Sequence, residues 1–174
     1  MNKTRPDRWL LLALSSFCLL TGASLWETVV FVPVWASGSP ATLSVIRANV
    51  GIDSTVLWIV LHSLFEAIYL AALVLNWKLK QRRAGLLAIA VVYVCLRLWT
   101  TAYFAPAFLA FQKLSSASDK PEALIESTVR WKNLNYIRTS AVVALNIWML
   151  MNVGTAIQPI AADSEFSRVD RSGA

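Results

Sequence analysis

The stretch VLWIVLHSLFEAIYLAALVLNW, residues 56–77, decides the fold class of this chain because it is long and apolar enough to cross a bilayer. It also carries His62 and Glu66, an imidazole and a carboxylate one helical turn apart near its middle. Ionisable groups at this depth are costly, about 2.5–3.5 kcal/mol for Asp, Lys or Arg on insertion scales, and they generally face the interior of a helix bundle. We therefore expect a transmembrane helix that packs against others carrying partners for these two side chains.

The overall composition also indicates an integral membrane protein. Of the 174 residues, 57% are hydrophobic and only 15% are charged, whereas a soluble domain carries about 25% charged residues. The net charge of +6 fits loops that contact anionic lipid on the cytoplasmic side. Because no basic patch is interleaved with aromatic residues, nucleic acid is not an expected partner.

Two cysteines, Cys18 and Cys95, each lie inside an apolar run. A disulfide framework or a thiolate metal site needs more cysteines at regular spacing. We therefore expect small, buried, apolar side chains at both positions.

Four stretches meet the requirement of about 20 mostly apolar residues for a spanning helix. The expected spans are residues 9–32, 55–77, 84–104 and 134–157. Pro106 closes the third span and Pro159 stops the fourth, because proline interrupts a helix. The predicted fold class is all-α: an integral membrane four-helix transmembrane bundle over residues 1–160, followed by a disordered cytoplasmic tail over residues 161–174.

The first span resembles a secretion signal, with a basic leader and small residues at cleavage spacing. Its apolar character continues past Ala23, so we expect an uncleaved helix. Orientation follows from the placement of Lys and Arg, with nine on the leader, the 78–83 link and the tail, against five on the other two connections. This predicts a multi-pass protein of the cell (inner) membrane with both termini in the cytoplasm.

The two extracytoplasmic connections are expected to form short helices at the membrane surface. Residues 33–54 contain SPATLSVIRANV, a candidate interfacial helix capped by Ser39 with Pro40 at its first position. In the 105–133 connection, Pro121 and the residues after it predict a short amphipathic helix that leads into the fourth span. We expect no internal repeat.

Five ionisable side chains fall within the spans, and their heights place them together. At a rise of about 1.5 Å per residue, all five lie in the extracytoplasmic half of the bundle. They are Glu27, His62, Glu66, Arg97 and Arg138. Two carboxylates balance two guanidinium groups, which leaves the one histidine of the chain to exchange a proton near neutral pH. A medium of low dielectric tolerates such a neutral set.

These residues predict a polar pocket with four candidate catalytic residues. His62 is the candidate general base and Glu66 orients it. Arg97 and Arg138 stabilise an anion. The candidate substrate-binding residues are Glu27, which balances charge or relays protons, Tyr103 near the loops, Trp131, which closes the mouth, and Asn135, which orients the substrate.

Two other interpretations of the same residues stay open. The first is that the polar pairs only hold four helices together, although such contacts in membranes contribute about 0.6 kcal/mol on average. The second is a mononuclear metal site built from Glu27, His62 and Glu66, which two neighbouring arginines oppose because they repel a dication. We therefore assign no metal and no cofactor.

Three motifs carry a resemblance to a known family. They are TGASLWETVVFVPVW in the first span, YFAPAF at the end of the third and RWKNLNYIRT at the start of the fourth. They resemble the anthrone oxygenase-like family of small four-span membrane proteins, over most of the chain from about Gly22 to Asn152. The family pattern W-x3-N-x2-R falls on Trp131, Asn135 and Arg138. The family name implies oxygenation of a polycyclic phenolic anthrone to a quinone without a cofactor.

The residues and the resemblance together predict a protein that takes a lipophilic small molecule from the lipid bilayer. The first hypothesis is a cofactor-independent oxygenase acting on an anthrone-like phenol. The alternative is a membrane-embedded binding or accessory protein that holds a lipid, quinone or other small molecule without catalysis. A third hypothesis is a structural subunit whose polar residues pair with a partner's helices. The oligomeric state is left open.

Overall fold

The computed structural model describes residues 5–39, 41–47, 51–113 and 121–157, and the regular elements in this part of the chain are all helices. Within it, four stretches are long and apolar enough to cross a membrane. They are Arg5–Ala36, Thr55–Leu75, Arg82–Lys113 and Glu122–Gly154. The prediction of an all-α, multi-pass membrane protein with four spans is confirmed. The predictions about Pro40, Pro159 and the 161–174 tail concern positions outside the described residues.

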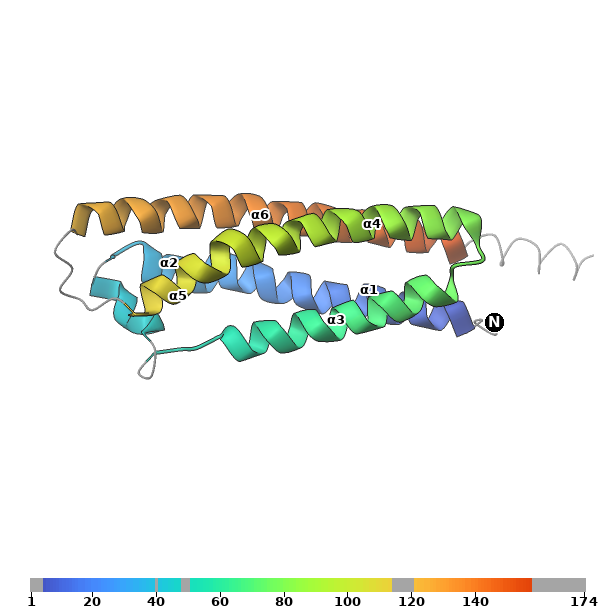
Figure 1. The fold of residues 1–174 in the computed structure, drawn as a ribbon, viewed down its shortest axis with the longest axis horizontal. Coiled ribbons are helices and arrows are strands. Elements are labelled where there is room, and N and C mark those ends of the chain that lie inside the picture. The colour runs from blue at the N-terminus through green and yellow to red at the C-terminus, as the bar shows by residue number, and fades with distance from the viewer. Residues whose placement is uncertain (1–4, 40, 48–50, 114–120, 158–174) are drawn as a thin grey trace, which may run out of the picture.

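The spans form a bundle of antiparallel neighbours (Figure 1). Helix α1 (Arg5–Trp26) packs along α3 (Thr55–Leu75) and along α6 (Pro121–Ile157), and α4 (Lys80–Trp99) packs along α6. Helices α3 and α4 follow each other in the chain but barely contact each other. In Figure 1, α4 and α6 form the upper pair and α1 and α3 the lower pair. The seam between α3 and α4 is therefore the loosely packed side of the bundle.

Short helices gather at one end of the bundle, which we call the distal end. There α2 (Val32–Ala36) continues the first span, α5 (Ala105–Lys113) continues the third, and the 3₁₀-helix η2 (Ala41–Ile46) packs against both. The opposite, proximal end holds the start of α1 and the turn between α3 and α4 (Figure 1). A short helix is confirmed where one was predicted after Ser39, as a 3₁₀-helix that buries Leu43 and Ile46.

Each of the two spans that run toward the distal end contains one turn of π-helix. Element η1 (Glu27–Phe31) joins α1 to α2, and η3 (Thr100–Phe104) joins α4 to α5. Pro33 and Pro106 follow these turns by two residues. In a regular helix the proline ring clashes with the carbonyl four residues earlier. Here that carbonyl lies in the π-helix, whose wider turn spans five residues and leaves more room.

One predicted boundary, the end of the third span, is wrong for this reason. The third span does not end at Pro106 but continues as a helix to Lys113. A helix does begin at Pro121 and lead into the fourth span as predicted, but it is not a short one, because α6 is a single helix of 37 residues. No Gly or Pro interrupts it between Glu122 and Val153. The amphipathic segment and the membrane segment therefore share one helix axis.

Two clusters of buried side chains fill the bundle, one along the four spans and one at the distal end. In the first, Phe17 stacks on Phe65 with ring centroids 4.7 Å apart, and Tyr93 packs edge-on against both. In the distal cluster the rings of Trp35 and Trp131 lie 5.1 Å apart. Because lipid tails are as apolar as these side chains, close packing rather than removal from water holds the spans together.

Both cysteines face outward, which corrects the prediction that they are buried. Cys18 and Cys95 are exposed on the outside of the bundle. The thiol of Cys18 still donates a weak hydrogen bond to Asn146 Oδ1 at 3.5 Å. Apolar neighbours in the sequence mark a membrane span, but they do not distinguish its lipid-facing side from its core-facing side.

A buried ion pair fixes the proximal end. Arg82 Nη1 lies 2.7 Å from Asp7 Oδ1, and Asp7 is only 4% exposed. Arg82 also donates to Asn76 Oδ1 at 3.2 Å, and the Asn76 amide donates to the carbonyl of Pro6 at 3.4 Å. These contacts tie the start of α1 to the turn between α3 and α4.

The variant Arg82→Met should lower the thermal unfolding temperature of the protein in detergent. It leaves the buried Asp7 carboxylate without the Arg82 guanidinium, and breaking a buried pair costs about 3–5 kcal/mol in soluble proteins. The double variant Asp7→Asn/Arg82→Met should regain part of the loss, because it also removes the negative charge. Circular dichroism melting compares the three proteins. Equal melting temperatures for wild type and Arg82→Met would show that this pair does not hold the proximal end.

Candidate functional site

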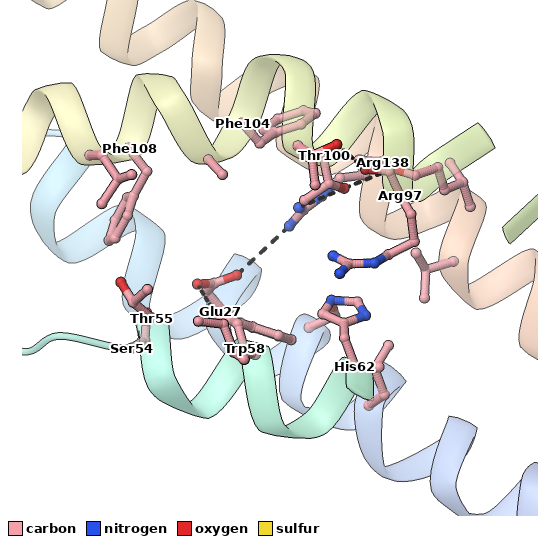
Figure 2. A pocket seen from close by; sticks show the side chains of 18 of the residues that line it. Glu27, Ser54, Thr55, Trp58, His62, Arg97, Thr100, Phe104, Phe108 and Arg138 are labelled. Atoms are coloured by element: carbon pink, nitrogen blue, oxygen red, sulfur yellow. Dashed lines mark hydrogen bonds and ion pairs between the residues drawn. The ribbon is translucent and has the colours of Figure 1, made fainter. Parts of the chain in front are cut away.

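A cavity of about 300 Å³ opens in the distal half of the bundle, between α3 and the span formed by α4, η3 and α5 (Figure 2). Most of its wall is apolar. Its ionisable lining includes Glu27, His62, Arg97 and Arg138, one from each of the four spans. The structure thus brings together four of the five side chains whose heights in the sequence predict a common site.

The first of two ion pairs lies in the inner wall of the cavity. Glu27 Oε2 is 3.8 Å from Arg138 Nη2, and their side chains are only 10% and 12% exposed. Trp58 Nε1 donates to Glu27 Oε1 at 2.9 Å, and Arg138 Nη1 donates to Thr100 Oγ1 at 3.4 Å. The Arg138 guanidinium carbon also lies 4.6 Å from the centroid of the Phe104 ring. This inner pair is therefore almost fully buried, and Figure 2 shows it as a dashed line between Glu27 and Arg138.

The two π-helices supply groups on both sides of Arg138. Glu27 is the first residue of η1 and Thr100 is the first residue of η3. A π-helix places an additional residue in one turn, so it redirects side chains that a regular helix would point elsewhere. Helix α6 packs against both of these spans, and its Arg138 receives one contact from each.

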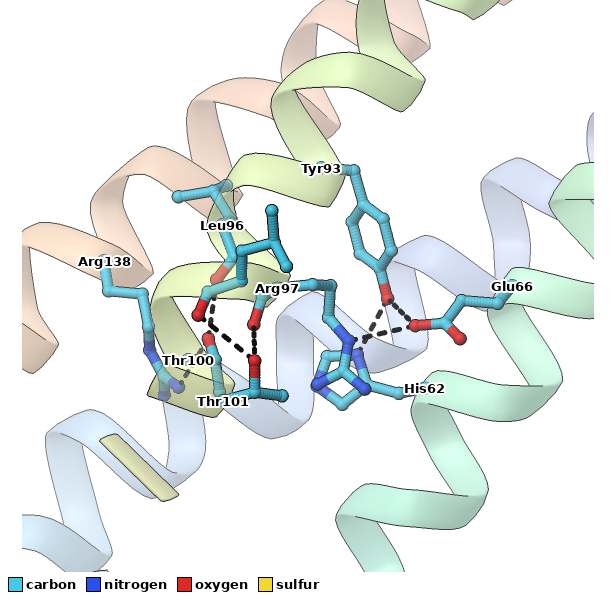
Figure 3. A network of polar contacts seen from close by, with 9 residues as sticks. His62, Glu66, Tyr93, Leu96, Arg97, Thr100, Thr101 and Arg138 are labelled. Atoms are coloured by element: carbon cyan, nitrogen blue, oxygen red, sulfur yellow. Dashed lines mark hydrogen bonds and ion pairs between the residues drawn. The ribbon is translucent and has the colours of Figure 1, made fainter. Parts of the chain in front are cut away.

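A second polar network lies nearer the outside of the seam between α3 and α4 (Figure 3). Arg97 Nε donates to Glu66 Oε1 at 2.9 Å, and the Tyr93 hydroxyl donates to the same oxygen at 3.1 Å. His62 Nδ1 lies 2.8 Å from the Tyr93 hydroxyl oxygen. The side chains of Glu66 and Arg97 are 45% and 29% exposed. This outer pair is therefore open to the surroundings of the bundle, unlike the inner pair.

The hydrogen bonds of Tyr93 determine which nitrogen of His62 carries the proton. An ionised carboxylate only accepts, so the Tyr93 hydroxyl donates its single hydrogen to Glu66. The Tyr93 oxygen then accepts from His62, which requires the hydrogen on Nδ1. In a neutral imidazole with a protonated Nδ1, the lone pair of Nε2 is free to accept a proton. His62 lines the cavity, so the site contains a base.

Five of the eight candidate site residues line the cavity: His62, Arg97, Arg138, Glu27 and Trp131. Glu66 contacts the Tyr93 hydroxyl, and the Tyr93 hydroxyl contacts His62, so the predicted orientation of His62 by Glu66 would pass through Tyr93. Glu66 is also not enclosed in the bundle as expected, because α3 and α4 diverge and leave its side chain half-exposed.

The other two candidates, Tyr103 and Asn135, lie away from the cavity wall. Tyr103 packs its ring against Phe104, with centroids 5.1 Å apart, beside the distal cluster. Asn135 is fully buried, and its amide donates to Thr28 Oγ1 at 3.0 Å. The hydroxyl oxygens of Thr28 and Thr139 lie 2.8 Å apart. Asn135 therefore belongs to the packed seam between α1 and α6.

Trp58 and Tyr93 belong to the site although the sequence patterns described above do not single them out. Trp58 lies four residues before His62, so it shares a helical face with that residue and the period of the helix would have identified it. Tyr93 lies one turn before Arg97 on α4, nearer the proximal end than Arg97. Its long side chain reaches the network from there, which a height estimate from the backbone does not capture.

The acidic groups do not assemble as a metal site. Across the described ranges, no three His, Cys, Asp or Glu side chains gather closely enough to hold a metal ion. The carboxylates of Glu27 and Glu66 instead face Arg138 and Arg97. The geometry therefore does not support the interpretation as a metal site.

No protein-family profile, curated protein or solved structure matches this chain. The resemblance to the anthrone oxygenase-like family stays a prediction that rests on three sequence motifs. The function of the site has to follow from its own geometry.

The protonation of His62 can be observed directly, because it is the only histidine in the chain. In protein labelled with ¹⁵N-histidine and purified without a histidine tag, the ring should be neutral and protonated on Nδ1, since Tyr93 accepts that hydrogen. In Tyr93→Phe this acceptor is absent, so the share of rings protonated on Nε2 should rise. The nitrogen chemical shifts report both forms.

The matched control is Tyr69→Phe. In the wild type the Tyr69 hydroxyl donates to the carbonyl of Leu86 and does not contact the site. It should leave the His62 signals unchanged. A wild-type ring protonated on Nε2 would contradict the assigned hydrogen-bond directions.

Proposed function

We propose that this protein is a membrane enzyme that removes a proton from a lipophilic, weakly acidic substrate and stabilises the anion that forms. The observation that supports the proposal is that His62, whose Nδ1 contacts the Tyr93 hydroxyl, lines a mostly apolar cavity together with Arg97 and Arg138. A general base needs a free lone pair within reach of its substrate. The anion needs fixed donors where its charge develops. This cavity contains groups suited to both tasks.

The charges in the cavity wall favour an anionic ligand. Two guanidinium groups, those of Arg97 and Arg138, are opposed by one carboxylate, that of Glu27. Glu66 neutralises Arg97 from the exposed side of the seam and does not line the cavity. The four charges balance as a set, but the cavity wall itself presents two guanidinium groups and one carboxylate. Guanidinium groups that face an apolar cavity favour the deprotonated form of a weak acid bound there.

The surroundings of the cavity favour a substrate dissolved in the bilayer. Ile59 and Leu109 line the cavity and are 60% and 43% exposed on the outside of the bundle. A flat apolar body with one phenolic or enolic oxygen matches such a wall, with the oxygen directed at the arginines. If both termini lie in the cytoplasm of the cell (inner) membrane, the cavity lies in the half of the membrane away from the cytoplasm.

The family resemblance supports one specific reaction, the oxygenation of an anthrone-like substrate. His62 Nε2 takes a proton from the ring CH₂ group, and Arg97 and Arg138 hold the enolate oxygen. The carbanion adds dioxygen to form a carbon–oxygen bond. The O–O bond of this peroxide then breaks while the second C–H proton moves to the departing oxygen, which gives a quinone carbonyl and hydroxide.

The proton and electron balance of this reaction closes without a cofactor. The released hydroxide takes the proton back from His62 as water. Four electrons pass from the carbon to dioxygen, so one oxygen atom enters the product and the other leaves as water. The chain from His62 through Tyr93 to Glu66 stabilises the imidazolium that exists between these steps.

Oxygen uptake with anthrone tests this activity in purified protein. His62→Ala should reduce the rate at least about 100-fold, the usual contribution of a general base. The control Tyr69→Phe should keep the wild-type rate, because that buried side chain lies outside the cavity. Arg97→Gln should reduce the rate as well, because it removes one of the two donors to the anion.

The same variants separate catalysis from binding alone. If His62→Ala turns over anthrone at the wild-type rate, the assigned base is wrong. A wild type that retains a phenol through purification without consuming oxygen favours the binding protein. In that case retention should be lost in Arg97→Gln and kept in His62→Ala.

A further inference from the structure

Two segments of the first half of the chain recur in the second half, in the same order and at the same spacing. SLWETVVFVPVW, residues 24–35, matches RLWTTAYFAPAF, residues 97–108, at a Leu, a Trp, a Thr, a Phe and a Pro. IDSTVLWIVLH, residues 52–62, matches IESTVRWKNLN, residues 125–135, at an Ile, a Ser, a Thr, a Val, a Trp and a Leu. Both matches use one shift of 73 positions without a gap. The chain therefore contains an internal repeat, contrary to expectation.

The structure repeats with the same shift. The π-helix η1 runs from Glu27 to Phe31, and η3 runs from Thr100 to Phe104, each end again 73 positions further along. Helices α1 and α3 form one closely packed pair, and α4 and α6 form the other. Successive repeats with the same orientation are related by an axis along the membrane normal, and binding sites lie between them.

Such an arrangement creates two seams at equivalent positions between the repeats, one between α1 and α6 and one between α3 and α4. The two seams differ in how closely their helices pack. The seam between α1 and α6 is tightly packed. Buried polar side chains hydrogen-bond across it, among them Thr28, Asn135 and Thr139. The equivalent positions of the seam between α3 and α4 are Thr101, His62 and Glu66. There the helices barely touch, and both Thr101 and Glu66 are exposed.

We propose that the chain is a tandem duplication of a two-helix unit, and that its open seam between α3 and α4 is the portal through which an acidic amphiphile leaves the bilayer and enters the cavity. The portal rests on the cavity being the ligand site proposed above. Neutral Asn and Thr hydrogen-bond to each other across a closed seam. His62 and Glu66, with Arg97, place larger and ionisable groups at the same positions and keep the second seam open.

The shape of the cavity supports entry from the side of the bundle. Ile59, Thr101, Ala105 and Leu109 line the cavity and are exposed, so they form its rim. At the distal end Trp131 lines the cavity and packs into the buried distal cluster, which closes that direction. The open direction therefore lies between the helices, where acyl chains surround the protein.

Photolabelling in lipid vesicles tests the portal without requiring turnover. The probe is an alkylphenol that carries a diazirine, dissolved in vesicles that contain the full chain. Ala105→Trp fills the rim with an indole, and the matched control Ala102→Trp adds the same indole to an exposed η3 residue that does not line the cavity. Mass spectrometry should find cavity residues labelled in wild type and control, and labelled several-fold less in Ala105→Trp.

Equal labelling of Ala105→Trp and wild type would overturn the portal and leave the proposed reaction standing. Labelling as expected, without oxygen uptake on anthrone, would refute the reaction and support the portal. A wild type that is not labelled in the cavity would overturn both.

A repeat-exchange variant tests the equivalence of the seams. His62→Asn/Glu66→Thr/Arg97→Ser gives the open seam the residues of the closed one, because Ser24 is the counterpart of Arg97. The variant should pack α3 against α4 and melt at a higher temperature than wild type. The single variant His62→Asn should fold and melt near the wild-type temperature, since Asn already occupies the equivalent position.

Double electron–electron resonance between two spin labels measures whether α3 and α4 move together in the exchange variant. The labels go on Val60 and Leu98, which are exposed on α3 and α4, in a background that lacks the two native cysteines. The distance should shorten in the exchange variant. An unchanged distance with a lower melting temperature would overturn the equivalence of the two seams.

Discussion

An ionised side chain inside a membrane needs a partner from another helix, and this requirement organises the bundle. Arg138 of α6 meets the Glu27 carboxylate of the first span and the Thr100 hydroxyl of the third. The indole of Trp58, from α3, binds the same carboxylate. One ion pair therefore links all four spans at the height of the cavity. Much of the remaining packing consists of apolar contacts, which lipid tails can replace at little cost.

The second ion pair, Glu66 with Arg97, has the same chemistry in a different setting. It lies in a seam that α3 and α4 leave open, so the polar network and the cavity are accessible from the side of the bundle. The internal repeat gives a physical reason for this difference. The same backbone unit is used twice, and one seam carries small neutral groups while the other carries ionisable ones. The proposed chemistry depends on that asymmetry, because His62 replaces the equivalent of Asn135.

Length, hydropathy and helical rise were sufficient to predict the four spans and the common height of the ionisable groups. They do not fix the rotation of a helix about its axis, because every face of a membrane span is largely apolar. Asn135 therefore faces the seam between α1 and α6 rather than the cavity, and Cys18 faces outward rather than into the core. Each π-helix also adds a residue to a turn and shifts the faces that follow it. The repeat was concealed because the second copy extends beyond the apolar core. There Arg130 and Lys132 stand where the first copy has Leu57 and Ile59.

The central claim is that the buried Glu27–Arg138 pair holds the four spans around the cavity. Thermal unfolding of Glu27→Gln, Arg138→Gln and the double variant, each compared with wild type, tests it most directly. Each single variant leaves one buried charge unpaired, so the double variant should be more stable than either single variant. If the two losses of stability simply add, the side chains do not interact, and the pair cannot be what organises the bundle.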